Sequence, residues 1–241
     1  MSYLNVQKRM LATYNSLRLG MFFIAFATPF IVVCWGKVWG IPWQNSISEY
    51  YFAPYGNQWH YEPYPGRTPF VGILFALGAF LFLYKGFSKA EDWALNCAGV
   101  FAVGVAMCPM YAETGYIPHS NVVHFTSAVL LFVCMAFTAI FCSGDTLDEI
   151  SDIKLRRFYK HLYYVVGWFM GLFPLIGLAL AYNFGAIERH TFWIEAVGNE
   201  AFAAYWLAKT LELRHSEYEK KELNGLLKKQ ISQTASPRPS L

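Results

Sequence analysis

Three polar side chains that could do chemistry interrupt a strongly apolar stretch near the end of the chain, FWIEAVGNEAFAAYW at residues 192–206. Glu195 and Asn199 are four residues apart and share one face of a helix, whereas Glu200 is rotated by about 100° from Asn199. Polar groups inside a membrane helix face other helices or a cavity, and they are functional by default. We therefore expect this segment either to bind a headgroup, proton or ion, or to hold neighbouring helices together by hydrogen bonds.

Two other segments carry further candidates. His124 begins the stretch HFTSAVLLF, and Ser127 lies one turn further along on the same face. Ser48 and Glu49 belong to the motif NSISEYY, and Arg67 can pair with a carboxylate or hold an anionic headgroup. The predicted ligand-binding residues are Ser48, Glu49, Arg67, His124, Ser127, Glu195, Asn199 and Glu200.

A metal site is the alternative that the histidines suggest. His119, His124 and His190 lie on the same predicted side of the membrane as Glu113, and histidine and carboxylate side chains bind zinc. The chain has neither an HxxxH nor an HExxH motif, and it has no GxSxG motif for a serine nucleophile. The sequence therefore predicts no cofactor, with zinc as the alternative.

The elements that must position these residues are membrane helices. The 241-residue chain is 56% hydrophobic and 15% charged, whereas a typical soluble domain is about 25% charged. Six nearly uncharged stretches suit the roughly 30 Å hydrocarbon core of a bilayer. They are residues 19–36, 70–84, 93–112, 122–142, 162–182 and 191–208. The sequence thus predicts an all-α integral membrane protein, a six-transmembrane helix bundle whose first span is not a cleaved signal peptide.

The basic residues predict the topology. If the N-terminus is cytoplasmic and the six spans alternate, 16 of the 19 Lys and Arg residues fall in cytoplasmic segments. This bias follows the positive-inside rule and puts both termini in the cytoplasm, across the plasma membrane if the source is bacterial. The predicted parts are a cytoplasmic lead at 1–18, the six-span domain at 19–210 and a cytoplasmic tail at 211–241 with a disordered end. No stretch resembles a nucleic-acid site.

Residues 37–69 form the longest predicted outer segment. They are rich in Trp, Tyr and Pro, which favour the membrane–water boundary and an irregular backbone. We expect them to form an aromatic-rich cap over the bundle. All five cysteines lie within or at the ends of the spans, where cysteine packs as a small apolar residue. Cys34 and Cys108 both fall near the outer face and are the pair to test for a disulfide.

The order of these motifs resembles the Frag/DRAM/Sfk family of six-span membrane proteins and a related uncharacterised bacterial membrane family. The likeness rests on Ile-Ser-Glu at residues 47–49, on His124 at the start of the fourth span, and on the aromatic and acidic residues 192–206. It covers roughly residues 15–210. The resemblance implies lipid organisation, remodelling or sensing, and it names no cofactor. The positions that it singles out are Ser48, Glu49, His124, Glu195 and Asn199.

Three functions compete at this point. The first is an outer-leaflet polar cavity that binds a lipid or small amphiphile, or organises lipids, without clear catalytic machinery. The second is a metal-dependent intramembrane lipid hydrolase. The third is a proton- or ion-coupled transporter built on Glu195 and Glu200. Membrane lipids are the predicted partners in the first.

Overall fold

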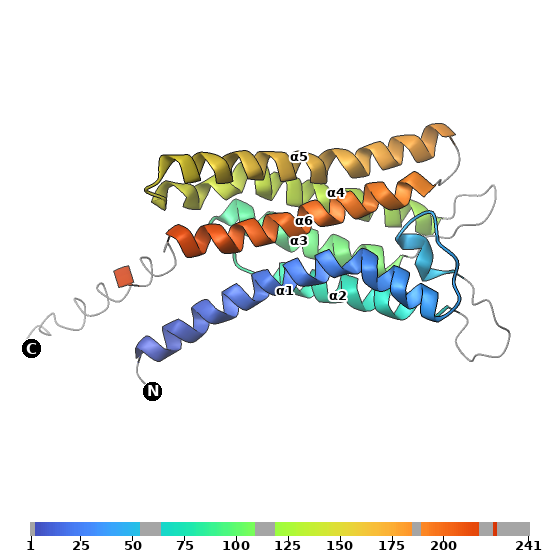
Figure 1. The fold of residues 1–241 in the computed structure, drawn as a ribbon, viewed down its shortest axis with the longest axis horizontal. Helices are drawn as coiled ribbons and strands as arrows, with labels where there is room; N and C mark the ends of the chain where they lie inside the picture. The colour runs from blue at the N-terminus through green and yellow to red at the C-terminus, as the bar shows by residue number, and fades with distance from the viewer. Residues whose placement is uncertain (1–2, 54–63, 109–118, 185–188, 217–223, 226–241) are drawn as a thin grey trace, which may run out of the picture.

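The computed structural model describes residues 3–53, 64–108, 119–184, 189–216 and 224–225. Within these ranges the regular structure is all helical and no strand occurs, which confirms the all-α part of the predicted fold class. Six long helices account for most of it (Figure 1). They are α1 (Tyr3–Val38), α2 (Arg67–Leu83), α3 (Lys89–Met107), α4 (His119–Phe137), α5 (Ile153–Phe184) and α6 (Arg189–Ser216).

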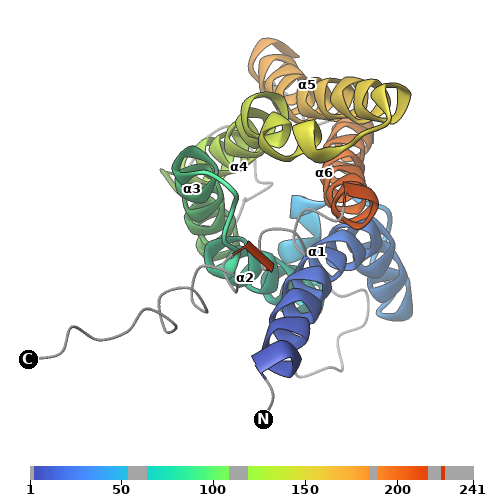
Figure 2. The same cartoon turned by 90° about the vertical axis from the view of Figure 1, so that its left-hand side faces the viewer.

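The helices follow one another around a ring. Each packs against the next in the chain, and α6 closes the ring by packing against α1 (Figure 2). The start of α1 and the end of α6 lie at the same end of the molecule (Figure 1). At this end the π-helix η2 (Thr138–Cys142) and the 3-10 helix η3 (Ser143–Glu149) join α4 to α5. A third short element, the 3-10 helix η1 (Ser48–Tyr51), lies at the opposite end.

Local chemistry sets the start of α3. The Ser88 hydroxyl accepts the Glu91 backbone N–H at 3.3 Å, and the Glu91 carboxylate in turn accepts the Phe87 N–H at 2.7 Å. This reciprocal arrangement is close to a capping box, which satisfies donors that a helix start leaves open. Asp92 adds a second carboxylate to the first turn, where the helix dipole favours negative charge.

The apolar character of the helices differs along the chain. Two helical segments of the described chain, residues 9–38 and 121–149, are both long and apolar enough to cross a membrane. Helix α2 is apolar but has only 17 residues. Helix α6 carries Glu195, Asn199 and Glu200 within its length, which lowers its mean hydropathy. Two segments of the described chain are thus both long and apolar enough, and six spans stay a prediction.

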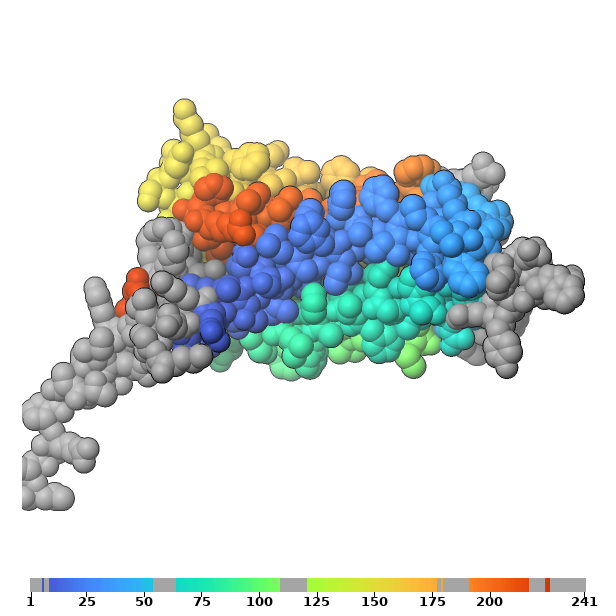
Figure 3. Space-filling view, turned by 60° about the horizontal axis from the view of Figure 1, so that its bottom comes forward, coloured from blue at the N-terminus to red at the C-terminus, as the bar shows by residue number. Residues whose placement is uncertain are grey.

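The interior of the ring contains two clusters of apolar side chains. The larger one includes Leu81, Tyr84 and Trp206, and the smaller one includes Tyr50 and Phe192 near η1. Along the outside of the molecule, α1 and α2 lie side by side (Figure 3). The smaller cluster holds η1 and the loop before it against the ends of the long helices, and this contact forms the site described next.

Candidate functional site

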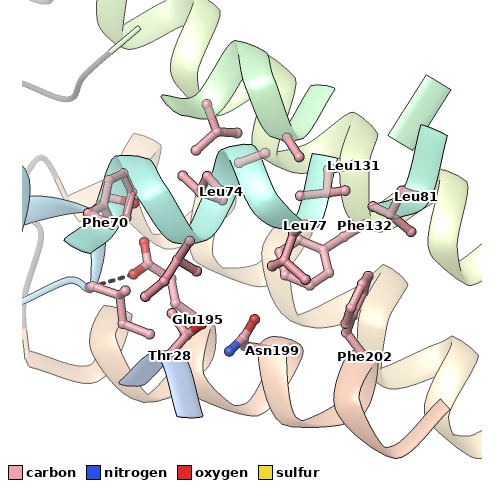
Figure 4. A pocket seen from close by; sticks show the side chains of 16 residues that line it. Thr28, Phe70, Leu74, Leu77, Leu81, Leu131, Phe132, Glu195, Asn199 and Phe202 are labelled. Atoms are coloured by element: carbon pink, nitrogen blue, oxygen red, sulfur yellow. Dashed lines mark hydrogen bonds between the residues drawn. The ribbon is translucent and has the colours of Figure 1, made fainter. Parts of the chain in front are cut away.

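A cavity of about 100 Å³ lies inside the ring, between α1, α2, α3, α4 and α6 and next to η1 (Figure 4). Twelve of its sixteen lining residues are apolar, and they extend from Phe70 near η1 to Leu81 in the middle of the bundle. The polar lining residues are Thr28, Ser48, Glu195 and Asn199. Three of the predicted site residues, Ser48, Glu195 and Asn199, therefore share one cavity.

Glu195 of α6 forms hydrogen bonds to the loop NSISE at residues 45–49, called the NSISE loop. Its Oε1 and Oε2 accept the Ser46 hydroxyl at 2.9 and 3.0 Å, and Oε2 also accepts the Ile47 backbone N–H at 2.6 Å. One turn earlier, the Phe192 N–H donates to the Asn45 carbonyl at 2.7 Å. The first turn of a helix has free N–H groups, and the loop supplies a partner for one of them. The Glu195 carboxylate thus holds a loop whose residues Ile47 and Ser48 line the cavity.

His124 connects the same loop to α4. Its Nδ1 lies 2.7 Å from the Cys108 carbonyl oxygen, and its Nε2 lies 3.1 Å from the Ser48 Oγ. Because a carbonyl can only accept, Nδ1 carries the proton and donates it. In the neutral ring the Nε2 lone pair is then left to accept the Ser48 hydroxyl. Residues from three separate parts of the chain therefore meet at the end of the cavity near η1.

Glu49 closes the loop on itself. Its Oε2 accepts the Asn45 backbone N–H at 2.9 Å, and the residue is buried without lining the cavity. Burial raises the pKa of Glu49, against the opposing effect of hydrogen bonds from the Asn45 and Ser46 backbone. Glu49 therefore shapes the loop from within, while Glu195 anchors it to α6.

Asn199 satisfies a backbone group in α1. Its Nδ2 donates to the Ala25 carbonyl at 2.5 Å. In a regular helix that carbonyl would accept the N–H of residue 29, but residue 29 is a proline and has none. Asn199 therefore supplies the donor that Pro29 lacks, while its side chain also lines the cavity.

The remaining predicted residues lie elsewhere. Arg67 is exposed, with its guanidinium carbon 5.2 Å from the centre of the Tyr51 ring, and it does not line the cavity. Ser127 is buried at the contact between α3 and α4, close to Gly104. Glu200 is half-buried and is not among the cavity residues. Arg67, Ser127 and Glu200 are therefore not part of the cavity lining.

The residues of the zinc alternative fall largely outside the described chain. Glu113 and the side chains of His119 and His190 lie outside it, and both ring nitrogens of His124 already have partners. Within the part of the chain that the structure describes, no group of three His, Cys, Asp or Glu side chains is arranged to hold a metal ion. Cys34 and Cys108 are free thiols. The zinc alternative stays a prediction for the residues outside these ranges.

A second polar cluster, which sequence reasoning missed, lies at the opposite end of the ring. Lys209 is fully buried, and its Nζ donates to the Thr146 Oγ1 at 2.6 Å and lies 3.1 Å from the Glu212 Oε2. The Tyr163 hydroxyl donates to the same carboxylate oxygen at 2.9 Å. Buried charges persist only when they are paired. The spacing of Lys209 and Glu212, three residues apart in a continuing helix, was the available signal.

No family model matches the chain, and neither a curated protein nor a solved structure does. The resemblance to the Frag/DRAM/Sfk family therefore stays a prediction that rests on its short motifs.

Proposed function

We propose that this chain is a six-span membrane protein whose cavity binds one acyl chain of a membrane lipid or a small amphiphile. One observation carries the proposal, namely that the cavity is lined mostly by apolar side chains but has Ser48 and Glu195 near η1 and Asn199 further in. An amphiphile has the same division, because its chain is apolar and its headgroup is not. Ser48 and Glu195 would face the polar part of the ligand, and Leu77, Leu81 and Phe202 would face its chain.

The size of the cavity supports a chain rather than a whole lipid. An apolar cavity of about 150 Å³ can stay dry and bind a molecule the size of benzene. A cavity of about 100 Å³ therefore suits a short alkyl segment, with the rest of the ligand outside it. The apolar walls favour such a segment over water, since water needs two to four polar partners.

The outer surface of the helices supports a membrane location. In the most apolar windows of residues 9–38 and 121–149, only 33% and 39% of the residues are buried. A core helix of a soluble protein would be mostly buried, and contiguous exposed apolar surface marks contact with lipid or protein. Exposed apolar residues occur on several helices. They include Phe26, Phe30, Phe75, Phe82, Val100, Phe141, Trp168 and Leu172.

The polar residues of α6 are compatible with a membrane span because their partners lie inside the bundle. Glu195 bonds to the NSISE loop, Asn199 to α1, and Lys209 to η3. Such interior pairing is how ionisable residues are tolerated in membrane helices. The 16 of 19 basic residues in the predicted cytoplasmic segments support the orientation in which η1 faces the outside.

Filling the cavity tests the proposal. Ala128 lines the cavity, so Ala128→Phe places an aromatic ring in the space that a chain would occupy. We expect lipid that co-purifies with the protein, measured by native mass spectrometry and lipid extraction, to fall by about tenfold or more. Ala79→Phe is the matched control, because Ala79 is exposed on α2 and outside this cavity.

Two results would contradict the proposal. One is wild-type protein that carries no stoichiometric lipid or amphiphile after mild detergent extraction. The other is an equal amount of bound lipid in wild type, Ala128→Phe and Ala79→Phe. Thermal unfolding of all three proteins, recorded in the same detergent, identifies any loss of lipid that follows from misfolding.

A further inference from the structure

Ser48 and His124 form a hydrogen-bonded pair at the polar end of the cavity, with 3.1 Å between the Ser48 Oγ and the His124 Nε2. We propose that Ser48 is the nucleophile and His124 the general base of an ester hydrolase whose substrate is an acyl lipid. This inference rests on the proposed function, because the acyl chain of the substrate would lie in the same cavity. Neither residue forms part of a GxSxG motif, so the sequence order gave no sign of the pair.

The geometry meets the requirements for an activated serine. A nucleophile and its base must lie within hydrogen-bond reach, and a third group must orient the base. Here the Cys108 carbonyl accepts the Nδ1 proton of His124 at 2.7 Å and so fixes the ring. His124 is therefore protonated at Nδ1, and its Nε2 lone pair is left for the Ser48 hydroxyl. This is the tautomer that a general base needs.

The loop holds the serine rigidly. The Ser48 N–H donates to the Ser46 Oγ at 3.0 Å, and Ser46 and Ile47 both donate to Glu195. Both residues that precede Ser48 are therefore fixed to α6, while Ser48 itself lines the cavity. Glu195 acts here as a positioning residue, since it holds the loop and does not touch the Ser48 side chain. Precise support of this kind is what a reacting group requires.

The reaction has two balanced halves. In the first, the Ser48 Oγ bonds to the carbonyl carbon of the ester as the bond from this carbon to the alcohol oxygen breaks. His124 takes the serine proton at Nε2 and gives it to the departing alcohol. In the second, water attacks the acyl-serine, His124 takes a proton from the water, and that proton returns to the Ser48 oxygen. The products are an alcohol and a carboxylic acid.

The lining of the cavity indicates the class of substrate. Apolar residues such as Leu74, Leu77 and Phe202 line the rest of the cavity, so the acyl side of the ester would point into the bundle.

A chain-bearing fluorophosphonate tests the assignment on the full-length protein in detergent. The probe reacts with activated serines, and the labelled residue is identified by mass spectrometry of the digested protein. We expect labelling at Ser48, its loss in Ser48→Ala, and a labelling rate lower by about 100-fold in His124→Ala. A decyl probe should react faster than an ethyl probe, because the longer chain buries more apolar surface against the cavity walls.

The controls are a buried serine and an exposed histidine away from the cavity. Ser143→Ala and His161→Ala should label at the wild-type rate. Thermal unfolding and bound lipid are measured for every variant, so that a misfolded Ser48→Ala protein is recognised. In that case Ser48→Thr is the second variant, and its labelling rate should be lower than that of wild type. Wild-type protein that carries lipid but is not labelled at Ser48 would overturn this inference and leave the lipid-binding cavity standing. Labelling that is unchanged in His124→Ala would also overturn it.

Discussion

At the scale of single residues, Asn199 and Pro29 depend on each other. Proline removes one hydrogen bond from a helix interior and leaves the carbonyl four residues earlier without its usual donor. In α1 this carbonyl belongs to Ala25, and Asn199 of α6 donates to it at 2.5 Å. An amide in an apolar helix is therefore explained by a defect in a different helix.

Replacing Asn199 by leucine tests this dependence. We expect Asn199→Leu to lower the free energy of unfolding by about 1–3 kcal/mol, because the Ala25 carbonyl loses its donor. In a Pro29→Ala background the same change should be less destabilising, since residue 29 then supplies a backbone N–H. A double-mutant cycle measured by reversible unfolding in detergent gives the coupling. Equal effects of Asn199→Leu in both backgrounds would show that Pro29 is not the reason for the asparagine.

These residues also show how far the sequence alone could lead. Residue type and depth predicted that Glu195, Asn199 and His124 share one leaflet beneath the cap that carries Ser48. In the structure Ser48, Glu195 and Asn199 line one cavity, and His124 contacts Ser48. The direct pairing of Ser48 with His124 was not predictable, because these residues are 76 apart and their contact depends on how the NSISE loop folds.

At the scale of elements, the end of the ring opposite η1 is joined by buried charges. Glu91 lies in the first turn of α3. Lys209 and Glu212 of α6 form an ion pair, and Lys209 also donates to Thr146 of η3. Burial raises the pKa of Glu91 above its ordinary value of 4.5, and the nearby Lys209 ammonium partly opposes this rise. Folded Glu91 therefore keeps its proton to a higher pH than it does in the unfolded chain.

This difference predicts how stability changes with pH. As the pH rises from about 4.5 through the folded pKa, the folded protein binds more protons than the unfolded chain, so stability falls. Glutamine cannot titrate. We expect the stability of wild type relative to Glu91→Gln to decrease across this window, by up to about 1.4 kcal/mol per pH unit. Thermal unfolding between about pH 4 and pH 8 measures it, with the exposed Glu149→Gln as control. If the stability of wild type relative to Glu91→Gln stays constant or grows with pH, the pKa of Glu91 is not raised in the folded protein.

At the scale of the whole molecule, the closed ring explains why average hydropathy identifies some helices and not others. Helix α1 has an exposed apolar side and few charges within its apolar part, so its composition alone identifies it as a candidate span. Helix α6 contacts both α5 and α1, and most of its polar groups face inward. These polar groups lower its mean hydropathy although few of its charges are exposed. The helical class follows from composition, whereas the ring order depends on packing between helices.

Cysteine labelling tests whether the ring spans a membrane with η1 outside. In a background without the five native cysteines, Lys37→Cys and Ser151→Cys place single exposed thiols at opposite ends of the bundle. We expect a membrane-impermeant maleimide to label Lys37→Cys in intact cells, and Ser151→Cys only after the membrane is opened, because the positive-inside rule puts the basic end in the cytoplasm. Detergent-solubilised protein gives the full labelling of each variant. Equal labelling of both thiols in intact cells would exclude this topology, and the reverse pattern would invert it and move Ser48 and His124 to the cytoplasmic side.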